Sequence, residues 1–144
     1  GIKDIDELNR RIADVLDIVR LKGQESTMPS ELSGGMQKRV ALARAIVVHP
    51  DCVCYDEPHA GLDPITAGTI DKLIKCLQKD HGMTNVVITH EMRSVFRIAD
   101  RIVFMKDGQV YWLGTPAEMK SSTDPVLVQF ISGHDGASDD WSPH

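Results

Sequence analysis

The stretch Leu32–Gln37, with the sequence L-S-G-G-M-Q, combines a helix-capping residue with two adjacent glycines. A serine at position 33 can accept a hydrogen bond from a free backbone N–H group of a helix that begins at Gly34. The start of a helix also favours an anion, because its free N–H groups and its dipole both point outward. Each glycine costs about 1 kcal/mol relative to alanine, a cost that is offset if a bulky charged ligand must approach the backbone. Taken alone, such a pattern is more often a simple loop-to-helix turn with a serine cap; together with the next motif it favours an anion site.

Two acidic residues end a stretch that has the character of a buried strand. The run 51–55 is mostly apolar and leads to Asp56 and Glu57. Pro58 then stops the strand, because proline cannot continue a central ladder. Paired carboxylates at the end of a buried parallel strand suit a metal ligand and a general base in nucleotide hydrolysis. A solvated turn after a strand is the alternative interpretation of the two acids.

A second apolar strand, Val86–Thr89, ends in His90, and the loop Ala60–Pro64 with Asp63 lies between the two strands. A single histidine at a strand end is more often structural than catalytic. Here, however, a glycine-rich helix start, an acid pair, a loop with an aspartate and a histidine follow one another in order. This combination favours a site for phosphate chemistry over a structural interpretation of each residue.

The spacing of apolar residues predicts the elements that position these side chains. Helices are expected at 4–21, 34–48, 65–79, 92–99, 116–120 and 124–131, and strands at 52–56, 85–89, 101–106 and 109–113. The first two strands and the helix between them are expected to form one βαβ unit with a right-handed crossover. Asp107 and Gly108 predict a type I′ hairpin turn between the last two strands. The composition from Gly133 onward predicts a solvated, poorly ordered tail.

The overall composition fits one ordinary globular domain. The 144 residues include 42% hydrophobic and 26% charged residues, as in most such domains. A net charge of −5 argues against an electrostatic nucleic-acid binder. None of the three cysteines forms a C-x-x-C pair, which favours free thiols over a zinc site or a disulfide framework. No apolar run approaches the roughly 20 residues that span a bilayer, so we expect any membrane link to come through a partner.

Over about residues 2–131, these motifs together resemble the nucleotide-binding domain of ABC ATPases. Leu32–Gln37 resembles the signature motif, Cys52–Glu57 the Walker B strand, Ala60–Asp63 the D-loop and His90 the switch histidine. Within the family, the chain looks most similar to the ATPases of Mce/Mla-type lipid transporters. The resemblance implies an α/β fold: part of a P-loop NTPase core with parallel strands, part of the helical subdomain and a C-terminal hairpin. It divides the chain into a helical portion at 1–50, the C-terminal half of the ATPase core at 51–131 and a tail at 132–144.

In this family two domains sandwich two ATP molecules head to tail, so the resemblance implies ATP and Mg²⁺ as cofactors. By carry-over, Asp56 would hold Mg²⁺, Glu57 would polarise the attacking water and His90 would contact the γ-phosphate. Asp63 would couple the two sites. A set from the signature motif would close over the nucleotide bound by the other protomer: Ser33, Gly34, Gly35 and Gln37. The expected roles agree with phosphoryl transfer, which needs positioning and neutralisation of charge more than covalent chemistry.

The sequence departs from the family pattern in two respects. No G-x-x-x-x-G-K-[ST] motif occurs, so the phosphate-binding loop and its lysine are absent, as is the family's glutamine loop. The chain therefore resembles a C-terminal half, and we expect it alone neither to bind ATP tightly nor to hydrolyse it. The missing strand is expected to expose two strand edges that favour self-association. His59 stands where the family more often has threonine or serine, which leaves the geometry beside Glu57 open.

The function implied by the resemblance is that of the ATP-hydrolysing subunit of a membrane transporter, with lipids as a candidate cargo. Its expected partners are a second ATPase protomer, forming a homodimer, and transmembrane permease subunits, with no nucleic acid. Its expected location is cytoplasmic, on the inner face of the cell membrane and held there through the permease. The alternatives are a non-enzymatic dimerisation or docking fragment, and an ABC ATPase without a transport role.

Overall fold

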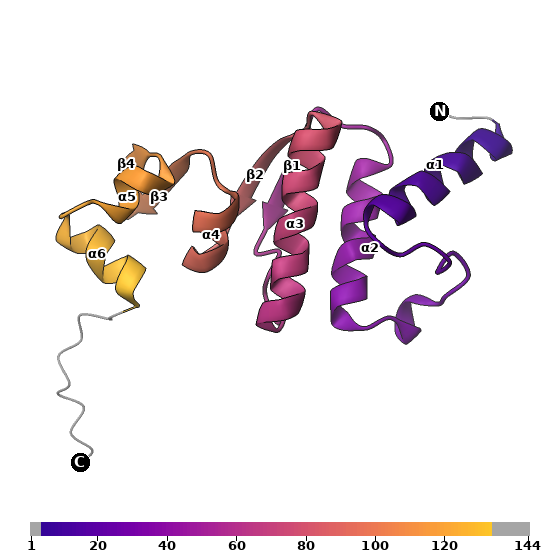
Figure 1. Cartoon of the computed structure of the whole chain (residues 1–144), viewed down its shortest axis with the longest axis horizontal. Coiled ribbons are helices and arrows are strands. Elements are labelled where there is room, and N and C mark those ends of the chain that lie inside the picture. The colour runs from indigo at the N-terminus through magenta and orange to yellow at the C-terminus, as the bar shows by residue number, and fades with distance from the viewer. Residues whose placement is uncertain (1–3, 134–144) are drawn as a thin grey trace, which may run out of the picture. The chain divides into compact units, whose positions relative to one another are not determined.

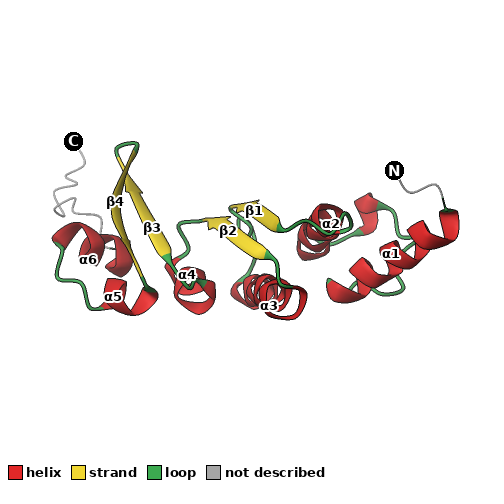
Figure 2. Cartoon of the chain, turned by 90° about the horizontal axis from the view of Figure 1, so that it is seen from above, coloured by secondary structure: helices red, strands yellow, loops and turns green. Residues whose placement is uncertain are grey.

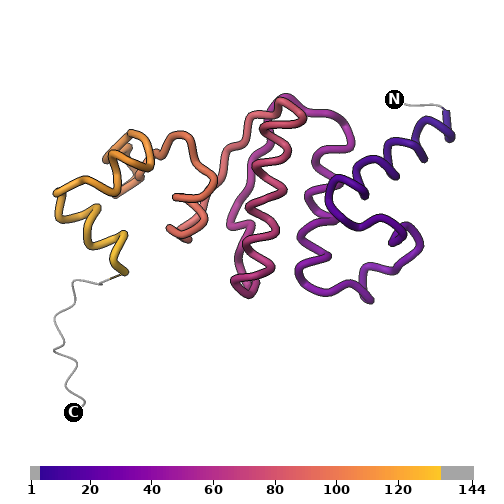
Figure 3. Tube along the Cα trace, viewed as in Figure 1, coloured from indigo at the N-terminus to yellow at the C-terminus, as the bar shows by residue number. Residues whose placement is uncertain are grey.

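A computed structural model describes residues 4–133, and its helices and strands follow one another along the chain as Figures 1 and 3 show. The helices are α1 (Ile5–Ile18), the 3-10 turn η1 (Pro29–Glu31), α2 (Gly34–Ile46), α3 (Pro64–His81), α4 (Met92–Ile98), α5 (Pro116–Lys120) and α6 (Pro125–Ser132). The strands are β1 (Cys52–Asp56), β2 (Thr84–Ile88), β3 (Ile102–Lys106) and β4 (Gln109–Gly114). Every helix and strand expected from the sequence is present, with ends that differ by a few residues.

The chain divides into two compact units, Gly1–Ser94 and Val95–His144. The first contains α1, α2, β1, α3 and β2, and it holds all the residues that the sequence singles out for chemistry. The second contains the β3–β4 hairpin with α5 and α6. The division at 1–50, 51–131 and 132–144 stays a prediction, and residues 134–144 of the expected tail lie outside the described residues.

In the first unit, β1 and β2 pair in parallel, with Cys52 opposite Thr84 and Asp56 opposite Ile88. Helix α3 connects them and lies along one face of the pair (Figure 2). Successive side chains of a strand point to opposite faces, and burial follows this rule: Val53 and Tyr55 are buried, whereas the residues on either side of each are exposed. The adjacent parallel strands with their connecting helix confirm the expected βαβ unit.

Helix α3 is fixed at both ends and along its length. The Asp63 carboxylate caps its start by accepting hydrogen bonds from two backbone N–H groups, and Gly82 ends it in the left-handed conformation (φ 66°). The Tyr55 hydroxyl donates to Asn85 (3.1 Å), and the Asn85 amide donates to the backbone oxygen of Ile74 (3.0 Å). Both strands are thereby tied to the helix. Burial raises the pKa of Tyr55 to about 12, so its hydroxyl stays a donor.

Helices α1 and α2 pack against each other, and Val15 of α1 and Leu42 and Ile46 of α2 are buried. The sequence predicted that α1 continues to residue 21, but it ends at Ile18. Arg20 takes a left-handed backbone conformation (φ 58°), and the Arg39 guanidinium of α2 donates to its carbonyl oxygen (2.9 Å). A tertiary contact therefore sets the end of this helix.

The second unit is built on the β3–β4 hairpin, in which Lys106 pairs with Gln109. Asp107 (φ 51°) and Gly108 (φ 75°) both have positive φ, which confirms the expected type I′ turn. Phe104 makes an edge-to-face contact with Phe130 of α6, with ring centroids 4.9 Å apart. Within residues 4–133, no helix has the length and apolar character needed to cross a bilayer.

Candidate functional site

Glu57 and His90 meet at the carboxyl ends of the two parallel strands. The Oε1 atom of Glu57 lies 2.9 Å from Nδ1 of His90, and the Thr89 hydroxyl lies 3.4 Å from Oε2 of Glu57. The Glu57 N–H donates to the carbonyl oxygen of Ile88 (2.9 Å), which extends the ladder by one residue. The contact therefore follows from the parallel pairing, because residues just past two adjacent parallel strands reach the same edge of the sheet.

The two side chains shift each other's pKa and remain open to solvent. The hydrogen bond from His90 lowers the pKa of Glu57, and the same bond raises the pKa of His90. The His90 side chain is 79% exposed and that of Glu57 is 35% exposed. An ionised carboxylate next to an accessible imidazole can accept a proton from water or orient a water molecule.

Asp56 is the last residue of β1 and directly precedes Glu57 in the sequence, and it is exposed to solvent. Among residues 4–133, no group of three or more His, Cys, Asp or Glu side chains could hold a metal ion by itself. Mg²⁺ keeps several waters and is usually bound by one or two carboxylates together with substrate phosphates. A single exposed carboxylate therefore fits a Mg²⁺ ion that a nucleotide shares.

The helix start predicted from Leu32–Gln37 is present and faces solvent in part. The Ser33 hydroxyl accepts a hydrogen bond from the Met36 N–H (3.3 Å), and both Ser33 and Gly34 are exposed. The two glycines differ. A Cβ atom on Gly34 would meet nothing within 4 Å, whereas one on Gly35 would lie 2.5 Å from Cγ2 of Thr66. Gly35 thus permits α2 to approach the start of α3, while only Gly34 presents open backbone.

Gln37 turns toward the loop that precedes α2. Its Nε2 atom donates to the carbonyl oxygens of Leu32 (3.2 Å) and Pro29 (3.4 Å). The residue is exposed overall, but its amide is engaged in holding the loop beside the helix start. In this conformation Gln37 supports the loop that contains Ser33.

Asp63 is exposed at the start of α3 and serves as its cap. Its carboxylate also accepts a hydrogen bond from the Thr66 hydroxyl, and this bond is the main reason that the pKa of Asp63 is lowered. Thr66 is the residue whose methyl group approaches Gly35. The structure therefore brings Asp63 and the helix start at Gly34–Gly35 into one neighbourhood.

His59 is the residue whose place the sequence left open. It is 7% exposed, and its Nε2 atom lies 2.8 Å from Oδ1 of Asp71 in α3. The Ser94 hydroxyl donates to the other oxygen of Asp71 (3.1 Å). The sequence offered no signal for this cluster, because its members come from three separate elements and none forms a motif with another.

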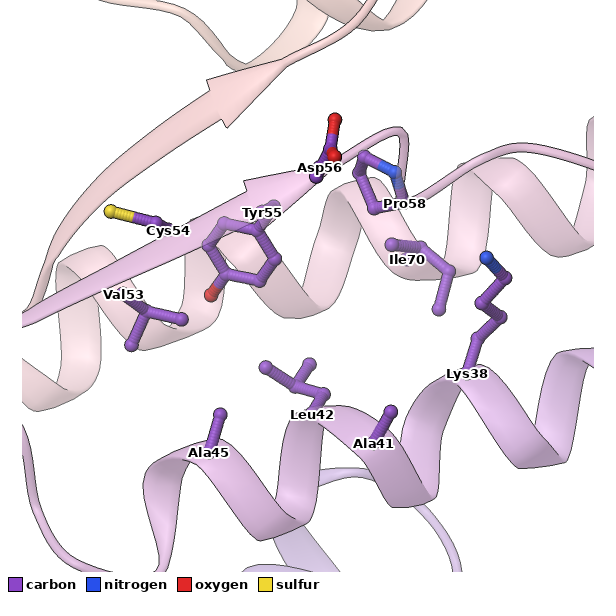
Figure 4. A pocket seen from close by; sticks show the side chains of 10 residues that line it. All are labelled: Lys38, Ala41, Leu42, Ala45, Val53, Cys54, Tyr55, Asp56, Pro58 and Ile70. Atoms are coloured by element: carbon purple, nitrogen blue, oxygen red, sulfur yellow. The ribbon is translucent and has the colours of Figure 1, made fainter.

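A pocket of about 210 Å³ lies between α2 and β1 (Figure 4). Most of its lining is apolar, with Lys38 and Asp56 among the polar side chains: Lys38, Ala41, Leu42, Ala45, Val53, Cys54, Tyr55, Asp56, Pro58 and Ile70. Asp56 is the one member that the sequence singled out. The Glu57–His90 pair lies outside this lining, so the predicted site is an exposed edge of the sheet and not a closed cavity.

Comparison with protein families and with curated proteins gives consistent matches. The family model described as ABC transporter matches residues 3–60. The phospholipid transport ATP-binding protein MlaF of Haemophilus influenzae is 44% identical over 118 residues, which are 82% of this chain and 45% of MlaF. The chloroplastic Protein TRIGALACTOSYLDIACYLGLYCEROL 3 of Arabidopsis thaliana is 36% identical over 143 residues, 88% of this chain and 41% of the relative. The sulfate/thiosulfate import protein CysA of Thermosynechococcus vestitus is 39% identical over 126 residues, 87% of this chain and 38% of CysA.

Solved structures of the same kind share the fold. The cbiO1 protein of Clostridium perfringens, part of the ABC transporter complex cbiONQ, matches with a TM-score of 0.79 and 31% identity, over 89% of this chain and 51% of its own. The ATP-binding cassette MJ0796, solved as a dimer in a post-hydrolysis state with ADP and Pi, matches with a TM-score of 0.69 and 33% identity, over 81% and 50%. These matches confirm the expected fold class, a partial P-loop NTPase core of the ABC type.

The chain spans less than half the length of the curated relatives described above and about half the length of the solved cassettes. Its motifs, its βαβ unit and its matches agree on one assignment. The chain matches the C-terminal half of the ATP-binding domain of the ABC transporter family.

Proposed function

We propose that this chain is part of the ATP-binding and ATP-hydrolysing subunit of an ABC transporter. The observation that supports this most directly is the contact between Glu57 and His90 at the ends of two adjacent parallel strands. A carboxylate and an imidazole placed there could act together on a water molecule and on a phosphate group. No sequence motif alone requires this contact, since residues far apart in the chain must be brought together.

In the proposed mechanism, Glu57 orients and polarises the attacking water, and its lowered pKa keeps it in the basic form. His90 donates a hydrogen bond to the γ-phosphate from the ring nitrogen that does not face Glu57. Asp56 would hold Mg²⁺, which supplies neutralisation of phosphate charge when bound. The protein thus contributes positioning and electrostatics more than covalent chemistry.

The helix start at Ser33–Gly35 would close over a nucleotide bound by a second protomer. Ser33 and Gly34 are exposed, and free N–H groups at a helix start favour phosphate. Gln37 holds the loop before the helix, and Asp63 lies in the same neighbourhood and would couple the two sites of a dimer. The dimeric state of the related cassette MJ0796 supports this arrangement.

The proposal extends to partners and cargo. Since MlaF is named for intermembrane phospholipid transport and is 44% identical, we propose a lipid cargo, chosen by permease and binding subunits. CysA, named for sulfate/thiosulfate import, is 39% identical, so an inorganic anion is the competing class of cargo. The proposed location is the cytoplasmic face of a membrane, reached through the permease.

We further propose that this chain by itself binds ATP weakly and does not hydrolyse it. Its sequence contains no phosphate-loop motif, and the backbone N–H groups and lysine of that loop are what hold the phosphates. Calorimetric titration with Mg-ATP is expected to show no binding at micromolar concentrations. Micromolar affinity would contradict this part of the proposal.

The experiment that tests the function is a chimaera in which this chain replaces the matching segment of the Haemophilus MlaF protein. The relative then supplies the phosphate loop, and the proposed catalytic residues all come from this chain. ATP turnover that depends on Mg²⁺ would support the proposal. A folded chimaera that binds ATP with the affinity of MlaF but shows no turnover would overturn it.

A second candidate, a non-enzymatic dimerisation or docking fragment, is favoured by one observation. The face of the β1–β2 pair opposite α3 exposes apolar side chains, with Val86 47% and Ile88 60% exposed, and each two-stranded sheet leaves strand edges unpaired among the described residues. Such edges favour pairing with another chain. Light scattering of the isolated chain is expected to show self-association. A monodisperse monomer with high thermal stability would contradict this candidate.

A further inference from the structure

We propose that His59 is a positioning residue, which holds the loop after β1 in the conformation that brings Glu57 to His90. The effect of His59 on catalysis rests on the proposed function. Its effect on the position of Glu57 can be tested in this chain alone.

His59 anchors the loop to two helices. Its imidazole is buried, and it contacts the Asp71 carboxylate of α3 at 2.8 Å, with the side chains of the two residues 5% and 1% exposed. The buried Ser94 hydroxyl of α4 donates to the same carboxylate. Both oxygens of Asp71 are therefore acceptors, and the loop, α3 and α4 meet at one carboxylate.

The loop itself has a conformation that needs such anchoring. Glu57 has a φ of 44°, a left-handed conformation that a non-glycine residue rarely adopts. Backbone of this kind costs about 1–3 kcal/mol and persists where the surroundings determine it from several sides. On one side, the Glu57 N–H donates to Ile88 of β2 (2.9 Å). On the other, the Leu62 N–H donates to the carbonyl oxygen of His59 (3.1 Å), and the His59 side chain fixes that turn to α3.

The two ring nitrogens of His59 differ in their contacts, and the difference indicates that the bond to Asp71 is what requires a histidine here. An ionised carboxylate can only accept, so opposite an ionised Asp71 the Nε2 atom of His59 is the donor of the bond that joins the two residues. The Nδ1 atom is buried without a hydrogen-bond partner among the described residues. An unsatisfied buried polar atom costs about 1–3 kcal/mol, which an apolar residue of similar size would avoid. The free-energy cost of burying Nδ1 without a partner is offset only if the bond from Nε2 to Asp71 holds the loop in a way that apolar packing would not.

The test uses His90 as a reporter of where Glu57 lies. The pKa of His90 is measured by NMR titration in the 144-residue chain and in three variants: Glu57→Gln, His59→Leu and His59→Gln. Glu57→Gln removes the carboxylate and defines the pKa of His90 without it. His59→Leu keeps the volume and removes the bond to Asp71, whereas His59→Gln places an amide N–H where Nε2 was. Circular dichroism and the amide spectrum show which variants are folded.

We expect His59→Leu to lower the pKa of His90 most of the way to its value in Glu57→Gln, and His59→Gln to restore most of the shift. A folded His59→Leu chain in which the pKa of His90 is unchanged would overturn the proposal. If His59→Leu does not fold, His59→Met replaces it, because the flexible methionine side chain can fill the same space without donating a hydrogen bond to Asp71. A lower pKa of His90 in His59→Met then supports the proposal, and an unchanged pKa overturns it.

The chimaera with MlaF separates this inference from the proposed function. There we expect His59→Leu to lower kcat by about 10-fold or more, with KM for ATP little changed, since a misplaced Glu57 affects the transition state more than nucleotide binding. An inactive unsubstituted chimaera would count against the proposed function and leave the NMR result to decide the role of His59. An active chimaera with unchanged kcat in His59→Leu would count against the positioning role.

Discussion

The first unit contains two contacts between a histidine and a carboxylate, and the main difference between them is how far they are buried. Glu57 and His90 are 2.9 Å apart, and the imidazole is 79% exposed. His59 and Asp71 are 2.8 Å apart, and the two side chains are 5% and 1% exposed. The same pair of functional groups thus occurs at nearly the same distance in two environments.

Burial decides what each pair can do. An exposed pair is worth little to stability, since water and salt screen it and its side chains are costly to order. It is accessible to a ligand, however, and its protonation responds to the solution. Breaking a buried pair leaves an uncompensated polar group in the interior and is strongly destabilising. We therefore propose ligand chemistry for Glu57 and His90, and structural support of the loop for His59 and Asp71.

The two glycines of the helix start show the same division. Gly34 has open space where a Cβ atom would lie, whereas Gly35 has the Thr66 methyl group there. One glycine is available to a ligand, and the other is needed for α2 to approach α3. Adjacent residues of one type therefore serve different purposes, which a motif cannot show.

The largest expected effect concerns the exposed pair. In the MlaF chimaera, Glu57→Gln should lower ATP turnover by about 10²–10⁴-fold, the usual contribution of a general base, while nucleotide binding persists. Turnover is measured as phosphate release and binding by calorimetry. Unchanged turnover would remove Glu57 from the role of base. In the isolated chain, the same change should leave the midpoint of thermal unfolding nearly unchanged.

The opposite result is expected for the buried pair. Asp71→Ala should lower the free energy of unfolding by about 3–5 kcal/mol, because it leaves the His59 imidazole and the Ser94 hydroxyl buried without their acceptor. Urea unfolding measures this value, and His90→Ala is the matched control at the exposed pair. A loss as small as that of the control would show that the buried contact contributes no special stability and would remove the contrast between the pairs.

A smaller effect separates the two glycines. Gly35→Ala should destabilise the chain by about 1 kcal/mol, since overpacking costs about 1–3 kcal/mol and the better helix propensity of alanine returns about 1. Thr66 cannot turn away freely, because its hydroxyl is bonded to Asp63. Gly34→Ala, with no neighbour within 4 Å, should be neutral or slightly stabilising. Equal midpoints in urea for the two variants would contradict the division between packed and open glycine.

Local features of the structure could be predicted from the sequence, and tertiary contacts could not. The Ser33 and Asp63 caps, the strand at Cys52–Asp56 and the turn at Asp107 depend on residues close together in the chain, so their signals are visible there. The end of α1 depends on the guanidinium of Arg39, and the burial of His59 depends on α3 and α4. The pattern of apolar residues places those elements but does not say which polar side chains will meet between them.

The smallest expected effect is a dependence of stability on pH that the exposed pair alone produces. His90 has a raised pKa, so its contribution is fully present below the ordinary pKa of histidine and is lost as pH rises through the raised value. Glu57 has a lowered pKa, so its contribution is present above the ordinary pKa of glutamate and is lost as pH falls through the lowered value. The difference in unfolding midpoint between the unsubstituted chain and Glu57→Gln should therefore be greatest between the ordinary pKa values of the two groups. It should fall at higher and at lower pH, and it should shrink when salt is added, because exposed charges are screened. If the difference in unfolding midpoint does not depend on pH or on salt, Glu57 and His90 do not pair in solution. The buried pair of His59 and Asp71 would then have no exposed pair with which to be compared.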